Sequence, residues 1–431
     1  MDTPIFTSEE VLAHYAQVAL VNDFYNGIDT ANKHLKRYEV ESTESYNTRI
    51  ELSALNNYTK RAVNSIRDMI TRKPIDDSEL QSSVLSPFIE TIDFSDNLVS
   101  FVNQLIINAA KDGFTFILVD KSPYDETIET KADESGLRPY LVNITRSQVK
   151  NWKLNANGTY KVFTFDEFYT VENRYSSISK VQQRVYLEDG TIEIWRGKKL
   201  YETIENGLGY IPIIKIGIDD IPPFYDLAKI NKRHFNQDSS GANYVRACGS
   251  PFTQAFMMSN QSGAIKVGAM NGISFNESKS DAGIEWVELS GKNFEIIETV
   301  IKRDEETMRM YLAEIISNDT QKTATEVGMM NAGNESKLSY YAEIVEAGIN
   351  KALTYMADYQ GVANFDAKIY ISRDFYNKTL TDAQIREYKG LFVDGVISWE
   401  KLTQLLIDGE VLSAMSDNEM ITEKARLSDA V

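Results

Sequence analysis

The side chains that most often carry enzymatic or metal chemistry are few in this chain and far apart. Its 431 residues include three histidines, His14, His34 and His234, and a single cysteine, Cys248. A structural zinc site needs four such ligands at short spacings, and one cysteine cannot form an internal disulfide. The sequence therefore predicts no metal site, and we expect no cofactor.

Nucleophilic and phosphate-binding motifs are also missing from the sequence. It contains no GxxxxGK[ST] loop, no HExxH and no GxSxG. Asp219 and Asp220 could act as an acid and base pair, but in so acidic a chain we expect them on a solvated surface. His234 falls on a helix with an apolar face and is expected in a core or interface. We predict no catalytic residue, which favours a structural or interaction protein.

A milder chemistry, weak and exchangeable hydrogen bonding, is available between two long helical patterns. Residues 318–337 are rich in Thr, Asn and Gly and are too polar for a core. They predict an exposed loop or a weak, interrupted helix. Its polar candidates are Thr320, Gln321, Lys322, Thr323, Thr325, Asn331, Asn334 and Lys337.

The charge balance limits the partners of the chain. There are 63 acidic and 45 basic residues, a net charge of −18, and no basic block. Tight nucleic-acid binding needs clustered Lys and Arg, so we do not expect it, although an acidic wall can let DNA pass without adhering. No apolar run approaches the ~20 residues that span a bilayer. The acidic N-terminus is unlike a signal peptide, and we expect synthesis in a cytoplasm.

Hydrophobic periodicity predicts an α+β fold of two or three domains. A helix at 98–109 leads through Gly113 into a buried strand, and period-two alternation over 158–216, with Asp189-Gly190 as a hairpin turn, predicts an antiparallel meander. Further strands are expected at 207–217, on a sheet edge that tolerates Pro212, and at 364–375. Helices are expected at 8–22, 44–71, 222–248, 293–317, 338–360 and, as a short pair joined at Asp394-Gly395, within 378–412.

Two helices carry charges that we expect in solvent. Arg49, Arg61 and Arg67 lie on the 44–71 helix, and the run from Lys302 to Glu306 lies opposite the apolar stripe of the 293–317 helix. Such charges usually form a solvated face, and a partner contact is the less common alternative.

The succession of segments resembles the portal proteins of tailed bacteriophages. It comprises Tyr46-x-x-Arg49, RDMITRKP, KDGFTFILVDKSP, RPYLVNITRSQVKNW, LGYIPIIKIG, PPFYDLAKINKRHF and TATEV at Thr323–Val327. Each motif is loose by itself, but together they cover about Tyr46 to Ile407, most of the chain.

The resemblance implies a portal-like fold: an α/β wing with an antiparallel sheet, a helical stem, a small β-rich clip and a short helical crown. Residues 1–221 would form most of the wing, 222–248 and 293–317 the stem helices, and 249–292 the clip. Residues 318–337 would be a tunnel loop, 338–377 would return to the wing, and 378–431 would be the crown and tail.

The resemblance also implies a function and a set of partners. The chain would form a ring, usually of twelve copies, at one vertex of the capsid, where DNA is packaged and later ejected; it would belong to the virion and not be an enzyme. Its partners would be the major capsid protein and scaffold, the terminase large subunit, and neck, adaptor and tail proteins. Residues implied in docking at the clip are Lys266, Asn271, Phe275, Lys279 and Trp286.

Double-stranded DNA in the channel would meet the hydroxyls and amides of the tunnel loop, with Lys322 and Lys337 as its only cations, and contact would be weak and non-specific. Two other readings stay open. One is another virion component such as a neck or adaptor protein, and the other is a cytosolic enzyme with a carboxylate pair.

Overall fold

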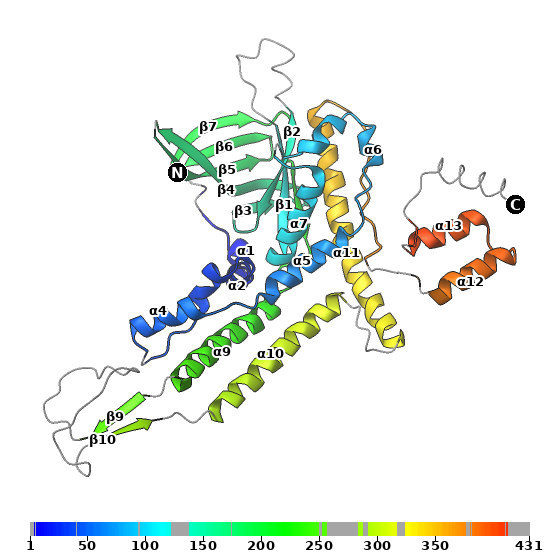
Figure 1. Cartoon of the computed structure of the whole chain (residues 1–431). Coiled ribbons are helices and arrows are strands. Elements are labelled where there is room, and N and C mark those ends of the chain that lie inside the picture. The colour runs from blue at the N-terminus through cyan, green and yellow to red at the C-terminus, as the bar shows by residue number, and fades with distance from the viewer. Residues whose placement is uncertain are drawn as a thin grey trace.

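The computed structural model of this chain describes residue 4 and residues 6–39, 41–93, 95–121, 138–173, 175–249, 252–256, 283–287, 292–316, 324–375, 380, 382–409, 411 and 412. It shows a mixed body of helices and sheets from which a pair of long helices projects (Figure 1). All the strand pairings among these residues are antiparallel. The predicted α+β class with antiparallel sheets is confirmed.

A three-stranded sheet of order β2-β1-β8 lies at the centre of the body. Its strands are β1 (Phe114–Lys121), β2 (Pro139–Thr145) and β8 (Ile213–Gly217). Helix α7 (Leu98–Asp112) ends at Gly113, whose φ of +87° is a left-handed conformation that favours glycine, and the chain then enters β1. β8 is an edge strand, as predicted for a strand that begins beside Pro212.

The two faces of this central sheet pack into different cores. Ile117, Val119 and Ile214 belong to a core shared with α7 and with α11 (Ala324–Tyr359). Phe116 and Leu118, the alternate residues of β1, belong to a second core beneath the meander. Burial on both faces explains why β1 is apolar along nearly its whole length.

The predicted meander is a five-stranded sheet of order β3-β4-β5-β6-β7. Its residues pack on the central sheet through aromatic contacts, and the rings of Phe116 and Phe163 lie 4.9 Å apart. Asp189-Gly190 joins β5 to β6, as predicted. The strands are β3 (Val149–Leu154), β4 (Tyr160–Asn173), β5 (Ser176–Leu187), β6 (Thr191–Arg196) and β7 (Lys199–Glu205).

Two helices predicted as continuous are each interrupted. The first is divided at Ala13 and His14, where His14 has a φ of +61°. The second, predicted over 44–71, is divided at residues 53–57: the Ser53 hydroxyl donates to the Arg49 carbonyl at 2.6 Å, and the Asn57 side chain caps the next helix. Polar side chains that bond to nearby backbone compete with a continuing helix.

The resulting helices of the N-terminal region are α1 (Glu9–Leu12), α2 (Tyr15–Asn26), α3 (Ile28–Ala31), the 3-10 turn η1 (Asn32–His34), α4 (Thr43–Leu52), α5 (Tyr58–Ile70), α6 (Ser78–Gln81) and the 3-10 turn η2 (Ser86–Thr91).

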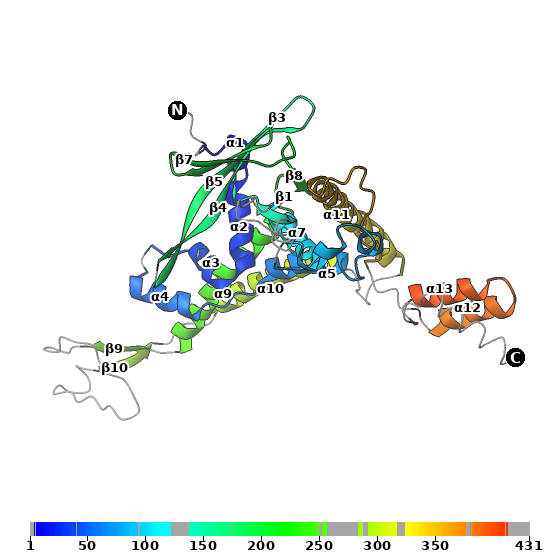
Figure 2. The same cartoon turned by 90° about the horizontal axis from the view of Figure 1, so that it is seen from above.

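The long helices α9 (Tyr225–Gly249) and α10 (Lys292–Ile316) have 25 residues each and pack against each other. Figures 1 and 2 both show them side by side, leading from the body to the short strands β9 (Phe252–Phe256) and β10 (Gly283–Val287). Gly241 allows a close approach, because a Cβ there would lie 3.3 Å from Ile297 Cγ2. We call α9, α10, β9 and β10 the helical hairpin.

A predicted strand at 364–375 is absent from the described structure, where Tyr370 forms only an isolated bridge with Asp76. Side chains of α11 take the hydrogen bonds that a neighbouring strand would have made. Asn350 both donates to the Ile369 carbonyl and accepts from its amide, and Glu346 accepts from the Ile371 amide at 2.7 Å.

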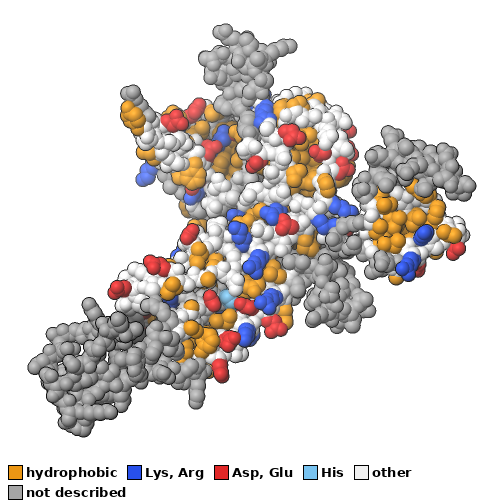
Figure 3. Space-filling model, in the orientation of Figure 1, with side chains coloured by type: hydrophobic (Ala, Val, Ile, Leu, Met, Phe, Trp, Pro, Cys, Tyr) orange, Lys and Arg blue, Asp and Glu red, His pale blue; other side chains and the backbone are white. Residues whose placement is uncertain are grey.

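The chain then forms α12 (Asp382–Val393) and α13 (Trp399–Asp408), with the predicted Ser398 cap accepting from the Lys401 amide. In Figure 3 apolar side chains are prominent on these two helices. None of their apolar side chains that the structure describes is buried. Within the described residues, no helix has the length and apolar character needed to cross a membrane.

Candidate functional site

The helical hairpin is the feature that the sequence singled out, and a buried ion pair joins its two helices. Arg233 of α9 donates through Nε and Nη2 to the two carboxylate oxygens of Asp304 of α10, at 2.7 and 2.6 Å. The Asp304 side chain is 0% exposed and that of Arg233 is 51% exposed. The expectation that Asp304 lies in a solvated charged face is therefore wrong, because α10 turns this residue toward α9.

A second contact between the two helices involves His234, which is buried as predicted. Its Nε2 lies 3.4 Å from Glu305 Oε1, and its ring packs edge-on against the ring of Tyr58 on α5. One turn further along α9, burial raises the pKa of Asp238, an effect that His234 opposes and Glu305 reinforces. His234 thus sits where α5, α9 and α10 meet.

Asn231 joins α9 to the start of α5. Its Oδ1 accepts from the amide and the hydroxyl of Thr59, at 3.2 and 3.1 Å, and its Nδ2 donates to the Asn56 carbonyl at 2.8 Å. The residue is fully buried. All of its side-chain bonding is directed at the body, so it fixes the rotation of α9.

Arg49 is a further correction, because this helix residue was expected in solvent and is buried. Its Nε and Nη2 donate to the two carboxylate oxygens of Glu41, both at 2.8 Å, and its Nη1 donates to Ser239 of α9 at 3.2 Å. These bonds lower the pKa of the Glu41 carboxyl. Arg61, by contrast, is exposed as expected, and Arg67 is half-buried and pairs with Asp68.

The polar contacts of α9 with the rest of the chain were not predicted, although the spacing of its polar residues indicates them. Asn231, His234, Asp238 and Ser239 recur at helical spacing on α9, among the apolar positions Leu227, Ala228 and Phe235. Polar residues on the apolar side of a helix must find partners when they are buried. They indicate that α9 packs against a polar surface of its own chain.

The predicted tunnel-loop residues are placed only in part. Thr320, Gln321, Lys322 and Thr323 lie outside the described residues. From Ala324 onward the backbone is helical, as the first turns of the 36-residue α11, so Thr325, Asn331, Asn334 and Lys337 lie on a helix and not in a loop. Lys337 is exposed. The contact of this segment with DNA stays a prediction.

The predicted clip residues are likewise placed only in part. Trp286 lies on β10 opposite Thr253 of β9, within a two-stranded antiparallel ladder at the end of the helical hairpin. Lys266, Asn271, Phe275 and Lys279 fall outside the described residues. Their role in docking stays a prediction.

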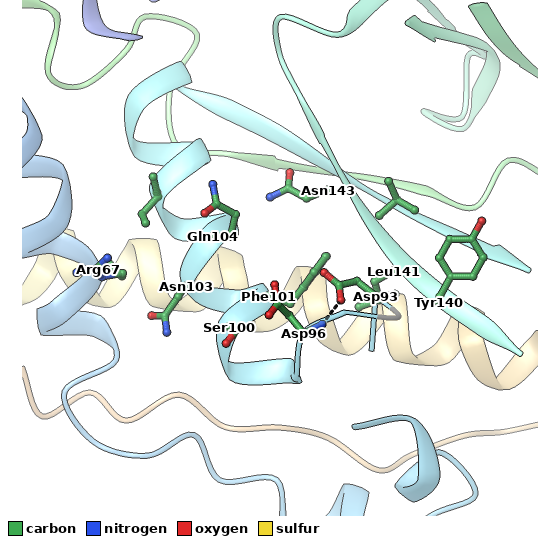
Figure 4. A pocket seen from close by; sticks show the side chains of 12 residues that line it. Arg67, Asp93, Asp96, Ser100, Phe101, Asn103, Gln104, Tyr140, Leu141 and Asn143 are labelled. Carbon is green, nitrogen blue, oxygen red and sulfur yellow. Dashed lines mark hydrogen bonds between the residues drawn. The ribbon is translucent and has the colours of Figure 1, made fainter. Parts of the chain in front are cut away.

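A pocket of about 540 Å³ lies in the body between α7 and β2 (Figure 4). Its Asp93 carboxylate accepts from the amides of Ser95 and Asp96 and so shapes a turn. Burial, with the negative charge of Asp120 next, raises the pKa of Tyr140 to about 12, and its hydroxyl donates to Asp120. None of the twelve residues that line this pocket pairs a nucleophile with a base.

The remaining carboxylates and histidines considered in the sequence do not form a shared site among the described residues. Asp219 and Asp220 are exposed, as expected. His34 pairs with Asp23 at 2.7 Å, far in sequence from His14. Among the residues that the structure describes, no three His, Cys, Asp or Glu side chains come together as a metal site would need.

This chain is similar to one family model over part of its length and to solved structures at low sequence identity. A family model described as a domain of unknown function (DUF4055) matches residues 223–360, which include α9, α10 and α11. No curated protein matches the chain. Among solved structures, a chain in the neck of an empty gene transfer agent (GTA) particle is similar at 13% identity and a TM-score of 0.43, over 86% of this chain and 94% of that one. A chain in the virion of a native GTA particle is similar at 13% identity and a TM-score of 0.42, over 81% and 89%.

Proposed function

We propose that this chain is the portal protein of a tailed-phage-like particle. In this proposal it forms a ring, of twelve copies if it follows the proteins that it resembles, at one vertex of the capsid. The ring is the channel through which DNA is packaged and ejected. It is a passive conduit, and the packaging motor supplies the ATP hydrolysis.

The observation that carries the proposal is the helical hairpin. Two helices of 25 residues leave the body together and end in a two-stranded ladder. At ~1.5 Å per residue each helix is roughly 37 Å long. A stem needs two such rods held at a fixed angle, and Arg233, Asp304 and Asn231 hold them at the root.

Exposed apolar side chains support assembly with further copies. Val245 of α9 and Ile296 and Met310 of α10 are 50, 66 and 57% exposed, and the apolar side chains of α12 and α13 also stay unburied. Two helices packed together leave the sides that face away from each other uncovered. In a ring, neighbouring subunits would cover these side chains.

The parts of the fold then have proposed roles. Residues 1–221 and 338–377 form the wing, α9 and α10 the stem, β9 and β10 part of the clip, and α12 and α13 the crown. The segment at 318–337 contacts passing DNA, and its second half reaches the channel as the start of α11. The clip docks the terminase large subunit and later the neck and tail proteins, and the body meets the capsid protein and scaffold.

The net charge of −18 agrees with a channel wall to which passing DNA does not adhere. Contacts with the duplex would be weak and non-specific, and the protein would reside in the virion after assembly in the host cytoplasm.

Replacing apolar residues of the hairpin tests whether it mediates assembly. We expect Ile296→Glu with Met310→Glu to reduce the particle mass in light scattering while circular dichroism stays that of the folded chain, because charged groups resist burial. The control, Leu154→Glu with Tyr175→Glu, changes two exposed apolar residues of the meander. Equal particle masses for the hairpin variant and the wild type would show that these hairpin residues do not mediate assembly.

A second experiment separates a portal from a neck or adaptor protein. A portal is required before DNA enters the capsid, whereas a neck or adaptor protein is added to filled heads. Particles made without this chain should therefore be empty of DNA. Filled heads that lack tails would assign the chain to the neck instead.

A further inference from the structure

A cleft of about 750 Å³ lies between α9 and the segment that follows α3. Five of its lining residues are cationic, and its apolar lining includes Leu20, Leu35 and Tyr225. The cations are Lys33, Lys36, Lys229, Lys232 and Arg233. Such a concentration stands out in a chain whose net charge is −18.

Acidic side chains balance only part of this charge. Asp23 pairs with Lys33 at 2.5 Å and with His34, Asp226 lies 3.6 Å from Lys229, and Asp304 pairs with Arg233. Five cations against three carboxylates leave an excess of two positive charges. Lys36 and Lys232 have no ion-pair partner within the part of the chain that the structure describes, so they account for the excess.

The walls of the cleft are held at a fixed separation by Asn236 of α9. Its Oδ1 accepts from the Lys36 amide at 2.7 Å, and its Nδ2 donates to the His34 carbonyl at 3.1 Å. Arg233 is oriented by two hydrogen bonds to Asp304. The backbone of one wall and the Arg233 side chain are therefore fixed before an anion binds, which lowers part of the entropic cost of binding.

We propose that this cleft binds a phosphate-bearing anion. Four lysines and Arg233 line one cavity, and a polyphosphate chain offers several negative oxygens within a small volume. The apolar lining formed by Leu20, Leu35 and Tyr225 would accept the non-phosphate part of a nucleotide or the sugar and base of a nucleic acid. Lys36 and Lys232 provide the charge that no carboxylate of the described chain neutralises.

The test uses the full chain and inorganic tripolyphosphate as the probe, with binding measured by isothermal titration calorimetry. We expect saturable binding by the wild type that weakens as salt is raised. The double variant Lys36→Ala, Lys232→Ala should lose at least about tenfold in affinity, because it removes two charge-assisted contacts. The matched control is Lys153→Ala with Lys198→Ala, two exposed lysines of the meander, and it should bind like the wild type.

A parallel titration with a short DNA duplex identifies the source of the phosphate. If the Lys36→Ala, Lys232→Ala variant binds only tripolyphosphate more weakly than the wild type does, the cleft is assigned to a free nucleotide-like anion. If the variant also binds the duplex more weakly, the cleft is assigned to the DNA backbone. No saturable binding of either probe by the wild type would overturn the proposal. Equal losses in the cleft and control variants would also overturn it, because they would show a general effect of charge. The proposal does not depend on the ring.

Discussion

Arg233 and Asp304 join the two long helices through a pair of hydrogen bonds, at 2.7 and 2.6 Å, and only the arginine reaches solvent. The Asp304 carboxylate is fully buried, and both of its hydrogen bonds from Arg233 come from one guanidinium. Another cation near it is Arg303, whose Nε lies 3.8 Å away. The relationship makes the pair asymmetric. The hydrogen bond to Asp304 also raises the pKa of Arg233, so the arginine stays charged.

The asymmetry predicts unequal costs of mutation. Arg233→Met leaves a buried, unpaired carboxylate, so we expect it to lower the free energy of unfolding by about 3–5 kcal/mol. Asp304→Asn leaves a half-exposed arginine that water can solvate, and it should cost about 1–3 kcal/mol. Urea unfolding followed by circular dichroism measures both. The exposed pair of Glu298 and Lys302 is the control, and Glu298→Gln should change stability by no more than about 0.5 kcal/mol. Equal costs for both members of the buried pair would contradict this reasoning.

A second prediction concerns Gly113, between α7 and β1. Its φ is +87°, and a Cβ would lie 2.4 Å from the carbonyl oxygen of Asp219. Gly361 has a φ of +70° but open space around it, so Gly361→Ala should cost only the left-handed strain of about 1–2 kcal/mol. Gly113→Ala should cost about 1–3 kcal/mol more, because backbone must move. Thermal unfolding of the two variants compares them, and a smaller effect at Gly113 would refute the crowding argument.

The pH dependence of stability supplies a third prediction, at Glu41. The hydrogen bonds from Arg49 hold the pKa of Glu41 below the ordinary glutamate value of 4.5. A lowered folded-state pKa adds stability that is fully present above the unfolded-state value and is lost as pH falls through the folded-state value. Glu41→Gln should therefore be less stable than the wild type at neutral pH and should lose less stability on acidification. Parallel acid-unfolding curves for the two proteins would contradict the assignment.

At Asp112 we expect the opposite dependence of stability on pH. It is 1% exposed, and burial raises the pKa of its carboxyl even though Asn22 donates to it at 2.6 Å. Stability from such a group is present at low pH and is lost as pH rises through the raised value. Asp112→Asn should gain stability relative to the wild type as pH is raised from acid to neutral. A relative gain at low pH instead would mean that the carboxylate is stabilised when charged.

How far the sequence determines this fold can be judged from particular residues. Gly113, Asp189-Gly190 and Ser398 act through local backbone geometry, and each was placed correctly. The break at Ser53–Asn57 was not predicted, because the local bonds of Ser53 and Asn57 are joined by hydrogen bonds that link Ser53 to Ser239 and the Asn56 carbonyl to Asn231, nearly two hundred residues away. The extended segment near Ile369 has a strand-like sequence, but Asn350 takes its hydrogen bonds.

The candidate site likewise has features that the sequence predicts and features that it does not. The long helices of the hairpin followed from their periodicity, whereas the burial of Arg49 and Asp304 did not, because a charged side chain on a helix is usually solvated. The helical start of α11 at Ala324 overrides a Thr, Asn and Gly composition that favours a loop. Asp304 is buried against Arg233 of another helix, whereas Arg49 bonds both to the nearby Glu41 and to the distant Ser239.

The proposed DNA contact predicts a phenotype for threonines just before and at the start of α11. Changing Thr320, Thr323 and Thr325 to Asp should leave ring assembly intact and reduce the DNA that capsids retain, because carboxylates repel passing phosphates. The control changes the same three residues to Ser, which keeps the hydroxyls. Nuclease-protected DNA per particle is the measurement. Loss of the rings themselves would show that this segment is structural.

The most direct test of the account is the particle mass of the purified protein, measured by light scattering, with negative-stain images of the same sample. The portal proposal predicts a mass of many subunits and rings with a central hole. If the chain is instead monomeric by itself and still forms no rings when it is expressed with its capsid and scaffold proteins, the proposed function is contradicted.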